Sequence, residues 1–225
     1  MPSVPANETE RLRSLRLYRI LDTGSEKTFD ELTRLAAAIC DTPISLISLI
    51  DENRQWFKAR VGLEVSATSR DVAFCAHAIL QRDVFVVEDA TKDLRFADNP
   101  LVMSDPSIRF YAGAPLTVAE GVSLGTLCVI DRVPRQLTPQ QMEALMVLRQ
   151  AVVTQLELRR ALEDLSVVER MLPMCAWCRS IRNADGTWSP LHKYLTRSVT
   201  VIHGMCPPCA ESMDRLDSTE PAPQY

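Results

Sequence analysis

The sequence predicts an α+β protein, in which a sheet built from hairpins carries helices on one face and is followed by a small cysteine-rich module. Two stretches rich in β-branched residues are each interrupted by a short polar turn, which is the pattern of a β-hairpin. Segments with apolar residues three and four positions apart precede and follow them, which is the period of an amphipathic helix. Four of the seven cysteines form two C-x-x-C pairs near the C-terminus.

Two helices are expected before the sheet. Residues 1–25 form an N-terminal helical segment that starts near Asn7, with Glu10 three residues later. A basic run in this segment is interpreted as a solvated helix face, because glutamates precede it: Arg11, Arg13, Arg16 and Arg19. A second helix follows the stretch DTGSEK, with its apolar residues on one side: Phe29, Leu32, Leu35, Ala36 and Ile39.

The sheet is expected between residues 43 and 131. PISLISLIDENRQWFKARVG predicts one hairpin with a turn at residues 51–53, and IRFYAGAPL with SLGTLCVID predicts a second hairpin that turns at Glu120 and Gly121. Between them, VFVVEDA predicts a strand, DVAFCAHAIL predicts a short helix, and KDLRFADNPLV predicts a short helix that ends in a loop.

The last strand of the second hairpin is apolar on both faces. Alternation predicts that Leu124, Cys128 and Ile130 face one way, and that Leu127 and Val129 face the other. Such a strand is central and covered on both sides. We therefore expect helices on one face of the sheet, and a cavity or loops on the other.

A long helix is predicted over residues 138–172. Thr138 and Gln141 form a capping box, Pro139 suits the first turn, and a helix of about 34 residues extends for about 50 Å. Its first half carries apolar positions suited to packing on the sheet: Leu145, Leu148, Val152 and Leu156. The second half has a thinner stripe, typical either of a dimerising or signalling helix or of a solvated linker: Leu158, Leu162, Leu165 and Leu172.

Composition narrows the classes of function. The net charge of -4 and pI near 5.5 argue against binding nucleic acid by bulk electrostatics. We find no apolar stretch of the length that a membrane span needs, and no apolar signal core at the N-terminus. A cytoplasmic location is therefore expected, in which the cysteines are thiols available for metal or redox chemistry.

Residues 26–160 resemble a GAF domain of the type found at the input end of bacterial sensor kinases and diguanylate cyclases. The stretches that carry the resemblance are LYRILDTGSEKTFDELTRLAA, ISLIDENRQWFKARVGL, DVAFCAHAI, VVEDATKDLRFADNPLV, IRFYAGAPL and LGTLCVIDRVPR. The resemblance implies a PAS/profilin-like antiparallel sheet with helices on one face and a ligand pocket on the other. It also implies a sensory role in signal transduction, as in two-component systems, with residues 161–172 as the coupling helix.

The ligand is not identified by the resemblance. The pattern of cyclic-nucleotide-binding GAF domains is missing, and the Cys-His pair of bilin-carrying ones is here Cys75-Ala76-His77. The residues expected to line the pocket are Trp56, Phe74, Cys75, His77, Arg109 and Tyr111. Against this, Cys75 can be a small buried core residue, and His77 a hydrogen-bonded structural one.

An enzymatic alternative follows from small GAF proteins that reduce free methionine sulfoxide with a catalytic cysteine. Cys75 is the candidate here, but the loop ADNPLVMSDPS contains no second cysteine, and Cys40 and Cys128 are expected in the core. Without a resolving thiol, an oxidised Cys75 has no evident route back. No kinase, cyclase or nucleotide-binding motif is present, so no catalytic residue is assigned.

The C-terminal module, residues 173–213, contains Cys175, Cys178, Cys206 and Cys209. Two C-x-x-C loops can supply the four thiolates of a structural zinc site, and a module of this size needs such a staple in order to fold. The stretch resembles a Cys-rich module at the ends of some bacterial sensor kinases and response regulators. We expect a zinc-ribbon or knuckle-like fold with a hairpin at Asp185 and Gly186, a helix in SPLHKYLTR and a strand in SVTVI.

Alternatives for this module remain open. His203 or His192 can replace one thiolate, four cysteines can also hold an iron–sulfur cluster, and a C-x-x-C can be a redox dithiol. Residues 214–225 are polar and Pro-rich, so we expect disorder there.

The sequence thus predicts a sensor that binds rather than catalyses. Its expected partners are a second copy of itself and a separate histidine kinase, cyclase or response regulator, with no membrane and no nucleic acid. The alternatives are a redox enzyme that uses Cys75, and a zinc-module interaction factor, for protein or nucleic acid, regulated by the GAF domain.

Overall fold

A computed structural model describes residues 3–119, 121–169, 171–183, 186–190 and 200–216. The chain divides into two compact units, residues 1–160 and residues 161–225.

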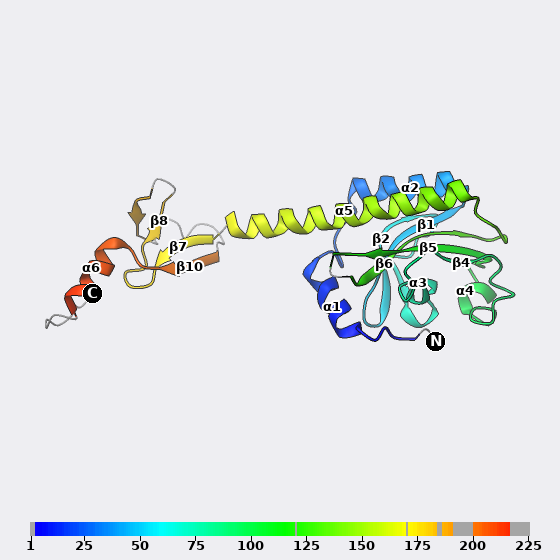
Figure 1. Ribbon diagram of the computed structural model, residues 1–225, viewed down its shortest axis with the longest axis horizontal. Helices are drawn as coiled ribbons and strands as arrows, with labels where there is room; N and C mark the ends of the chain where they lie inside the picture. The colour runs from blue at the N-terminus through cyan, green and yellow to red at the C-terminus, as the bar shows by residue number, and fades with distance from the viewer. Residues whose placement is uncertain (1–2, 120, 170, 184–185, 191–199, 217–225) are drawn as a thin grey trace. The chain divides into compact units, whose positions relative to one another are not determined.

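The first unit is built on a six-stranded sheet (Figure 1), with the strand order β3-β2-β1-β6-β5-β4. Every neighbouring pair in this order is antiparallel. The strands are β1 (Ile44–Ile50), β2 (Arg54–Val61), β3 (Ala67–Ser69), β4 (Phe85–Val87), β5 (Phe110–Thr117) and β6 (Ser123–Asp131). The predicted hairpins are β1–β2 and β5–β6, which confirms the antiparallel α+β fold.

The helices of this unit lie on both sides of the sheet, but the long ones share one face. They are α1 (Glu8–Leu17), α2 (Lys27–Cys40), α3 (Phe74–Ala78), α4 (Pro100–Met103) and α5 (Pro139–Glu169), with a 3-10 turn at Arg70–Val72. Figure 1 shows α2 and the first half of α5 against one face of the sheet, and α3 and α4 on the other side. This arrangement agrees with the prediction that β6 is apolar on both faces and covered on both sides.

The core has two layers, one on each face of the sheet. On the helical face, Leu127 and Val129 of β6 pack with Phe29 of α2 and with the buried residues of α5, which are the predicted Leu145, Leu148, Val152 and Leu156. On the opposite face, Cys128 and Ile130 pack with residues of α3 and β5. β6 lies between β1 and β5, so its prediction as a central strand is confirmed.

Leu124 is an exception to the predicted alternation, because it packs in the helical layer with Leu127. The β5–β6 register shifts between Pro115 and Thr117, where Thr117 pairs with Ser123. Between the Pro115 and Thr117 pairs, β6 has one residue more than β5, so the alternation of side chains along β6 is reversed there. Gly125 lies at this shift, where a Cβ atom would stand 1.9 Å from the Ser48 carbonyl oxygen, so only glycine fits.

The long helix starts as predicted. The Thr138 backbone N–H donates to Gln141 Oε1 at 3.0 Å, and the Gln141 N–H donates to Thr138 Oγ1 at 3.2 Å. However, α5 ends at Glu169, earlier than the predicted residue 172, and a strand begins at Met171. Pro173 disfavours helical backbone at the residue before it, and the strand finds its hydrogen bonds in a neighbouring strand instead.

The N-terminal helix departs from prediction at two residues. Asn7 makes no side-chain capping bond. Arg11 is not part of a solvated face, because it is 1% exposed and donates to the Ile50 carbonyl at 2.6 Å and to the Glu8 carboxylate. Glu8 also accepts from Arg70 at 2.6 Å, so these three residues form one buried ionic group. Arg13, Arg16 and Arg19 are not buried.

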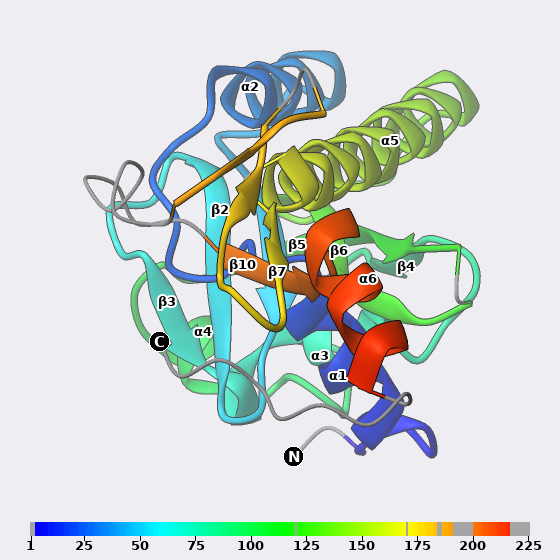
Figure 2. The same ribbon diagram turned by 90° about the vertical axis from the view of Figure 1, so that its left-hand side faces the viewer.

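The second unit has a small four-stranded sheet in the order β10-β7-β8-β9. Its elements are β7 (Met171–Cys175), β8 (Ile181–Arg182), β9 (Trp188–Ser189), β10 (Thr200–Gly204) and α6 (Pro207–Leu216). β8 and β9 are antiparallel, as expected for the predicted hairpin, whereas β7 and β10 are parallel neighbours. β10 leads into α6 (Figure 2).

Several predictions for this unit concern residues outside the described ranges. Ser189, the first residue of the stretch SPLHKYLTR, belongs to β9, whereas residues 191–197 of the expected helix, including His192, lie outside the described residues, as does Asp185. α6 continues to Leu216, which is inside the segment predicted to be disordered.

Among the described residues, none of the helices combines the length and apolar character that crossing a membrane requires.

Candidate functional site

A cavity of about 440 Å³ lies on the sheet face opposite to α2 and α5. Its walls come from β1, β2, β3, α3, α4, β5 and β6 and from the segments that follow β2, α4 and β6. Three of the predicted ligand-binding residues line it, namely Phe74, Cys75 and Tyr111. Other apolar lining residues are Leu46, Phe57, Leu63, Leu101, Ile108 and Ile130. Most of the wall is therefore hydrophobic, as is usual for small-molecule sites.

The Tyr111 ring is held in this wall by local packing. It lies 5.3 Å from the ring of Phe74 and is 0% exposed. Gly113, two residues along β5 on the same face, leaves room for it, because a Cβ there would stand 2.1 Å from the Tyr111 hydroxyl. The glycine therefore sets where the phenol can lie in the cavity wall.

Two buried polar atoms in the cavity wall have no hydrogen-bond partner among the described residues. They are Gln55 Oε1 and Thr68 Oγ1, on residues that face each other across β2 and β3. Gln55 is only 5% exposed. A buried polar atom without a partner costs about 1–3 kcal/mol, so these two atoms mark a place where a ligand group can satisfy them.

The charged residues of the cavity wall are Glu64, Asp105 and Arg132. The Arg132 guanidinium is already engaged, because its Nε donates to the Pro106 carbonyl at 3.1 Å. Two carboxylates against one guanidinium make the lining electronegative. Such a lining disfavours anionic ligands.

Cys75 has a thiol neighbour that sequence reasoning missed. Its Sγ lies 3.8 Å from Sγ of Cys128, and the Tyr111 hydroxyl donates to it at 3.2 Å. Cys128 does lie in the core, as expected, but the expectation that Cys75 has no second thiol within reach is wrong. The two cysteines are 53 positions apart, so only the packing of α3 on β6 brings them together.

The other predicted pocket residues lie elsewhere. His77 makes an edge contact with the Phe96 ring, with 4.8 Å between centroids, and its pKa is lowered by burial and by the nearby Arg95. Arg109 donates to the Val102 carbonyl at 2.9 Å and to the Ile108 carbonyl at 3.1 Å, which ties α4 to β5. Neither residue lines the cavity.

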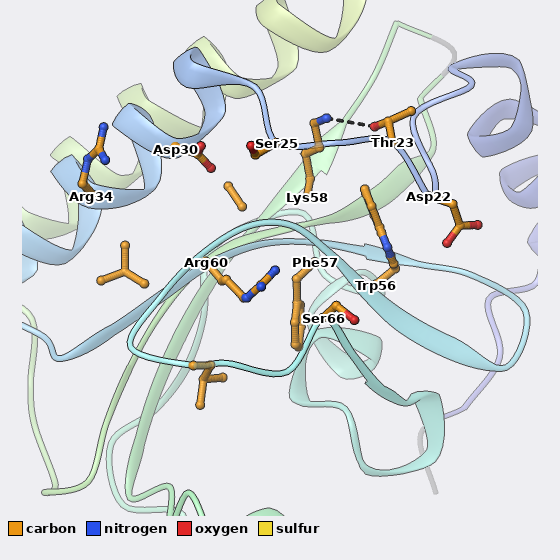
Figure 3. A pocket seen from close by; sticks show the side chains of 13 residues that line it. Asp22, Thr23, Ser25, Asp30, Arg34, Trp56, Phe57, Lys58, Arg60 and Ser66 are labelled. Atoms are coloured by element: carbon orange, nitrogen blue, oxygen red, sulfur yellow. Dashed lines mark hydrogen bonds between the residues drawn. The ribbon is translucent and has the colours of Figure 1, made fainter.

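Trp56 lines a second hollow, on the α2 side of β2 (Figure 3). This groove of about 590 Å³ has β2 as its floor and α2, with the loop before it, as its wall. Lys58 is buried there, and its Nζ donates to Thr23 Oγ1 at 2.9 Å, the Gly24 carbonyl at 2.7 Å and Glu26 Oε1 at 2.6 Å. Its ammonium group is therefore satisfied within the protein, and the groove does not require a ligand.

The second unit contains one cluster of metal-ligating side chains among the described residues. The Sγ atoms of Cys175, Cys178, Cys206 and Cys209 all lie within 4.8 Å of one another. Cys178 is exposed, and the other three are buried. Four thiolates in such a group are positioned to bind one metal ion.

The parallel pairing of β7 and β10 explains why the two pairs meet. Cys175 is opposite Gly204, which places the end of β7 two residues before Cys206. The Ala176 N–H donates to the Gly204 carbonyl, so the first turn is fastened to the second segment. Arg179 adopts a left-handed backbone with φ of 59°, which closes the first turn behind Cys178.

The backbone around the first turn favours a thiolate at Cys175. Burial by itself raises the pKa of the Cys175 thiol, but N–H groups of the turn and the neighbouring Cys206 lower it to about 6. One of these donors is the Cys178 N–H, at 3.5 Å from Cys175 Sγ. The backbone of His203 is in β10, whereas its side chain, the alternative ligand, lies outside the described residues.

Comparisons with known proteins agree with this geometry. Residues 25–158 match the profile of the family described as the GAF domain. A cyclic di-GMP phosphodiesterase of Pseudomonas aeruginosa is 50% identical over 134 residues, which are 60% of this chain and 23% of that protein. The chain thus spans less than a quarter of the length of that relative. The GAF domain of an Acinetobacter phosphoenolpyruvate-protein phosphotransferase has a similar fold, with a TM-score of 0.52 and 19% identity over 70% of this chain and 96% of that one.

Proposed function

Because the chain belongs to the GAF domain family, we propose that its first unit senses a small ligand in bacterial signal transduction. The observation that carries this proposal is the hydrophobic cavity with its two unpartnered polar atoms. The similarity to part of a cyclic di-GMP phosphodiesterase supports a place in signalling of that kind. In this proposal the first unit binds the signal.

The cavity wall indicates the chemistry of the ligand. Gln55 Oε1 accepts hydrogen bonds, and the Thr68 hydroxyl can accept or donate, so the ligand brings an N–H or O–H group to this end. The remaining wall suits an apolar or aromatic body. The electronegative lining favours a neutral or cationic molecule over a phosphate or carboxylate. A cyclic nucleotide therefore fits poorly.

A matched pair of fluorescent probes tests this proposal. N-phenyl-1-naphthylamine is neutral and carries an N–H donor, while 1-anilinonaphthalene-8-sulfonate adds a sulfonate to the same rings. We expect the neutral probe to bind the full chain with a rise in fluorescence, and the sulfonate to bind at least tenfold more weakly. Equal binding of the two probes, or binding of the sulfonate alone, would sink the proposed ligand class.

Two single-residue variants test whether the naphthylamine binds in this cavity or in the second groove. Gln55→Leu removes an unpartnered acceptor from the cavity, and we expect about a tenfold loss of affinity for the naphthylamine. Arg60→Ala is the matched control, because Arg60 is on the same strand but is exposed in the second groove. If Arg60→Ala weakens binding and Gln55→Leu does not, the groove of Figure 3 is the ligand site instead.

We also propose that the four cysteines hold a structural zinc ion. A tetrahedral zinc with Zn–S bonds of about 2.3 Å has sulfurs about 3.8 Å apart. The 3.7 Å between Sγ of Cys178 and Sγ of Cys206 agrees with that spacing. When bound, zinc would supply a cross-link between the two turns, with Cys175 and Cys178 from one turn and Cys206 and Cys209 from the other.

The same spacing argues against an iron–sulfur cluster, whose inorganic sulfides and several irons would separate the thiolates further. Elemental analysis of the purified full chain is expected to find about one zinc per chain, in a colourless protein. Visible absorption from iron, or four freely alkylated cysteines with no metal, would refute the zinc site.

We propose a homodimer as the signalling form. Leu158, Leu162 and Leu165 are four and three residues apart on α5, and their side chains are 51%, 58% and 59% exposed. This spacing is that of a coiled-coil seam, so two copies of α5 can bury the stripe. A separate histidine kinase, cyclase or response regulator in the cytoplasm would then read the change in this helix.

A further inference from the structure

Two of the buried thiols of the first unit are close together, and ligand binding does not account for them. Cys75 on α3 and Cys128 on β6 are 1% and 0% exposed, and their Sγ atoms are 3.8 Å apart. Both are free cysteines. The third thiol of this unit, Cys40 at the end of α2, belongs to the core layer on the other face of the sheet.

The surroundings of Cys75 favour its thiolate. The hydroxyl of Tyr111 donates to its Sγ at 3.2 Å, and the hydroxyls of Ser48 and Thr126 lie beside it, 3.1 Å from each other. Burial alone raises the pKa of the Cys75 thiol, but hydrogen bonds from these groups and from Cys128 lower it to about 7. Burial and the neighbouring Cys75 raise the pKa of Cys128. Of the two thiols, Cys75 is therefore the more acidic.

The two thiols differ in access. Cys75 lines the cavity, whereas Cys128 is not one of its lining residues. A small molecule in the cavity therefore meets Cys75 first, and Cys128 lies directly behind it. A more acidic thiol that lines a cavity, with a second thiol in contact behind it, is the arrangement that two-step thiol oxidation requires.

We propose that Cys75 and Cys128 are a peroxide-reactive thiol pair, in which a small hydroperoxide enters the cavity, oxidises Cys75, and leaves Cys128 to close a disulfide. In the first step the Cys75 thiolate attacks one peroxide oxygen, the O–O bond breaks, and the other oxygen leaves as water or an alcohol after taking up a proton. Cys75 becomes a sulfenic acid, oxidised by two electrons, and the peroxide is reduced by two.

In the second step the Cys128 sulfur attacks the Cys75 sulfur. The S–O bond breaks, and the hydroxyl group leaves as water with the Cys128 proton. For hydrogen peroxide the sum is two thiols and one peroxide giving one disulfide and two waters. The sulfurs must close from 3.8 Å to about 2.05 Å, which moves Cys75 Sγ away from its present position in the cavity wall. Oxidation thereby changes the ligand cavity.

Peptide mapping of the full wild-type chain tests the pair without any substitution. The reduced protein is treated with one equivalent of hydrogen peroxide at pH 7, free thiols are blocked with N-ethylmaleimide, and the digest is read by mass spectrometry. We expect a cross-linked peptide that joins Cys75 to Cys128 and that dithiothreitol reverses. Recovery of both residues as blocked thiols, with disulfides confined to the four C-terminal cysteines, would overturn the proposal.

Three variants separate the two steps. Cys128→Ser is expected to stop at a Cys75 sulfenic acid, which dimedone traps, and Cys75→Ser to leave Cys128 unreactive. Cys40→Ser is the matched control, since Cys40 is equally buried, lines neither cavity, and has a pKa that burial raises to about 11. Dimedone labelling of Cys40 at a rate similar to that of Cys75 would show general thiol oxidation and contradict the pair. Binding of the naphthylamine probe is measured separately, so the failure of either proposal is distinguishable from that of the other.

Discussion

Gln55 and Thr68 place two unpartnered polar atoms in a hydrophobic wall, opposite each other on β2 and β3. A sequence selected only for stability would carry apolar residues there, because nothing among the described residues offsets the lost hydration of these atoms. In the proposed function, a ligand offsets this loss when it binds. The same two residues would then lower the stability of the free protein and supply its specificity.

Thr68→Val tests whether the Thr68 hydroxyl lowers the stability of the free protein and contributes to ligand binding. Valine keeps the shape and removes the hydroxyl, so we expect the free energy of unfolding in urea to rise by about 1 kcal/mol while the naphthylamine binds more weakly. Thr117→Val is the control, because Thr117 is exposed on β5 and its hydroxyl bonds with Ser123 at 3.0 Å. A loss of stability in Thr68→Val, with unchanged binding, would mean that the Thr68 hydroxyl has a structural role.

The carboxylate of Glu8, on α1, is stabilised in its charged form by two neighbouring guanidinium groups. Burial by itself raises the pKa of its carboxyl, but the guanidinium groups of Arg11 and Arg70 lower it from an ordinary 4.5 to about 2. A group whose pKa is lowered by folding stabilises the protein above its unfolded pKa. This contribution is lost as the pH falls from about 5 through about 2.

Glu8→Gln is therefore expected to lower the free energy of unfolding by about 3 kcal/mol at pH 7, since it leaves the Arg11 charge buried without its partner. The difference from wild type is expected to shrink between pH 5 and pH 2. Chemical denaturation over that pH range measures it, with Glu10→Gln as a solvent-exposed control on the same helix. A difference that does not change with pH would contradict the ionic explanation.

At the scale of the element, α5 has two different halves. The first packs on the sheet through four buried residues, and the second carries a stripe of leucines exposed to solvent. The capping box at Thr138 and Gln141 determines where the helix begins. The first half of α5 is thus anchored on the sheet, and the second half carries an exposed apolar stripe. Such a helix can transmit a change in the domain to a second copy of the chain.

Leu162→Glu tests the helix as a dimer seam. A charge in the centre of the stripe is expected to weaken dimerisation at least tenfold in sedimentation velocity, without changing the folding of the first unit. Met146→Glu is the matched control, because Met146 is exposed on the first half of the same helix and lies outside the stripe. A chain that is monomeric before any substitution, or a dimer that Leu162→Glu leaves intact, would rule out this seam.

At the scale of the whole molecule, the two units are stabilised by different means. The first unit has two extended hydrophobic layers. The second has a described cluster of Cys175, Cys206 and Cys209, with Trp188 packed against them, and few other buried residues. Because the clustered cysteines are also the proposed ligands, the proposed metal would stand in for an extended hydrophobic core.

Removal of the metal is therefore expected to unfold one unit alone. With a zinc chelator, amide hydrogen exchange should lose protection across residues 171–183 and 200–216 and keep it in residues 1–160. Cys206→Ser should reproduce this pattern without chelator, whereas Cys40→Ser should not. Unchanged protection of β7 and β10 after verified metal loss would contradict the metal as the staple.

Local patterns were sufficient for several elements of this protein. The two hairpins, the start of α5 and its buried residues depend on neighbours a few positions apart, and such contacts are encoded in short stretches of sequence. The two C-x-x-C pairs also have a spacing specific enough to predict that their four thiols form one cluster. Errors arose where a distant partner overrides the local pattern, as when Arg11 is buried against Glu8 and Ile50, or when β10 pairs with the segment expected to continue α5.

The sequence by itself thus determined the α+β class, the family resemblance and the cysteine module, because periodicity and motif spacing are properties of short segments. Only the tertiary structure decided which residues meet at the cavity. Gln55 meets Thr68 through the register of β2 and β3, and Cys75 meets Cys128 through the packing of α3 on β6. Register and packing depend on the whole chain, so no local pattern in the sequence encodes these two pairs.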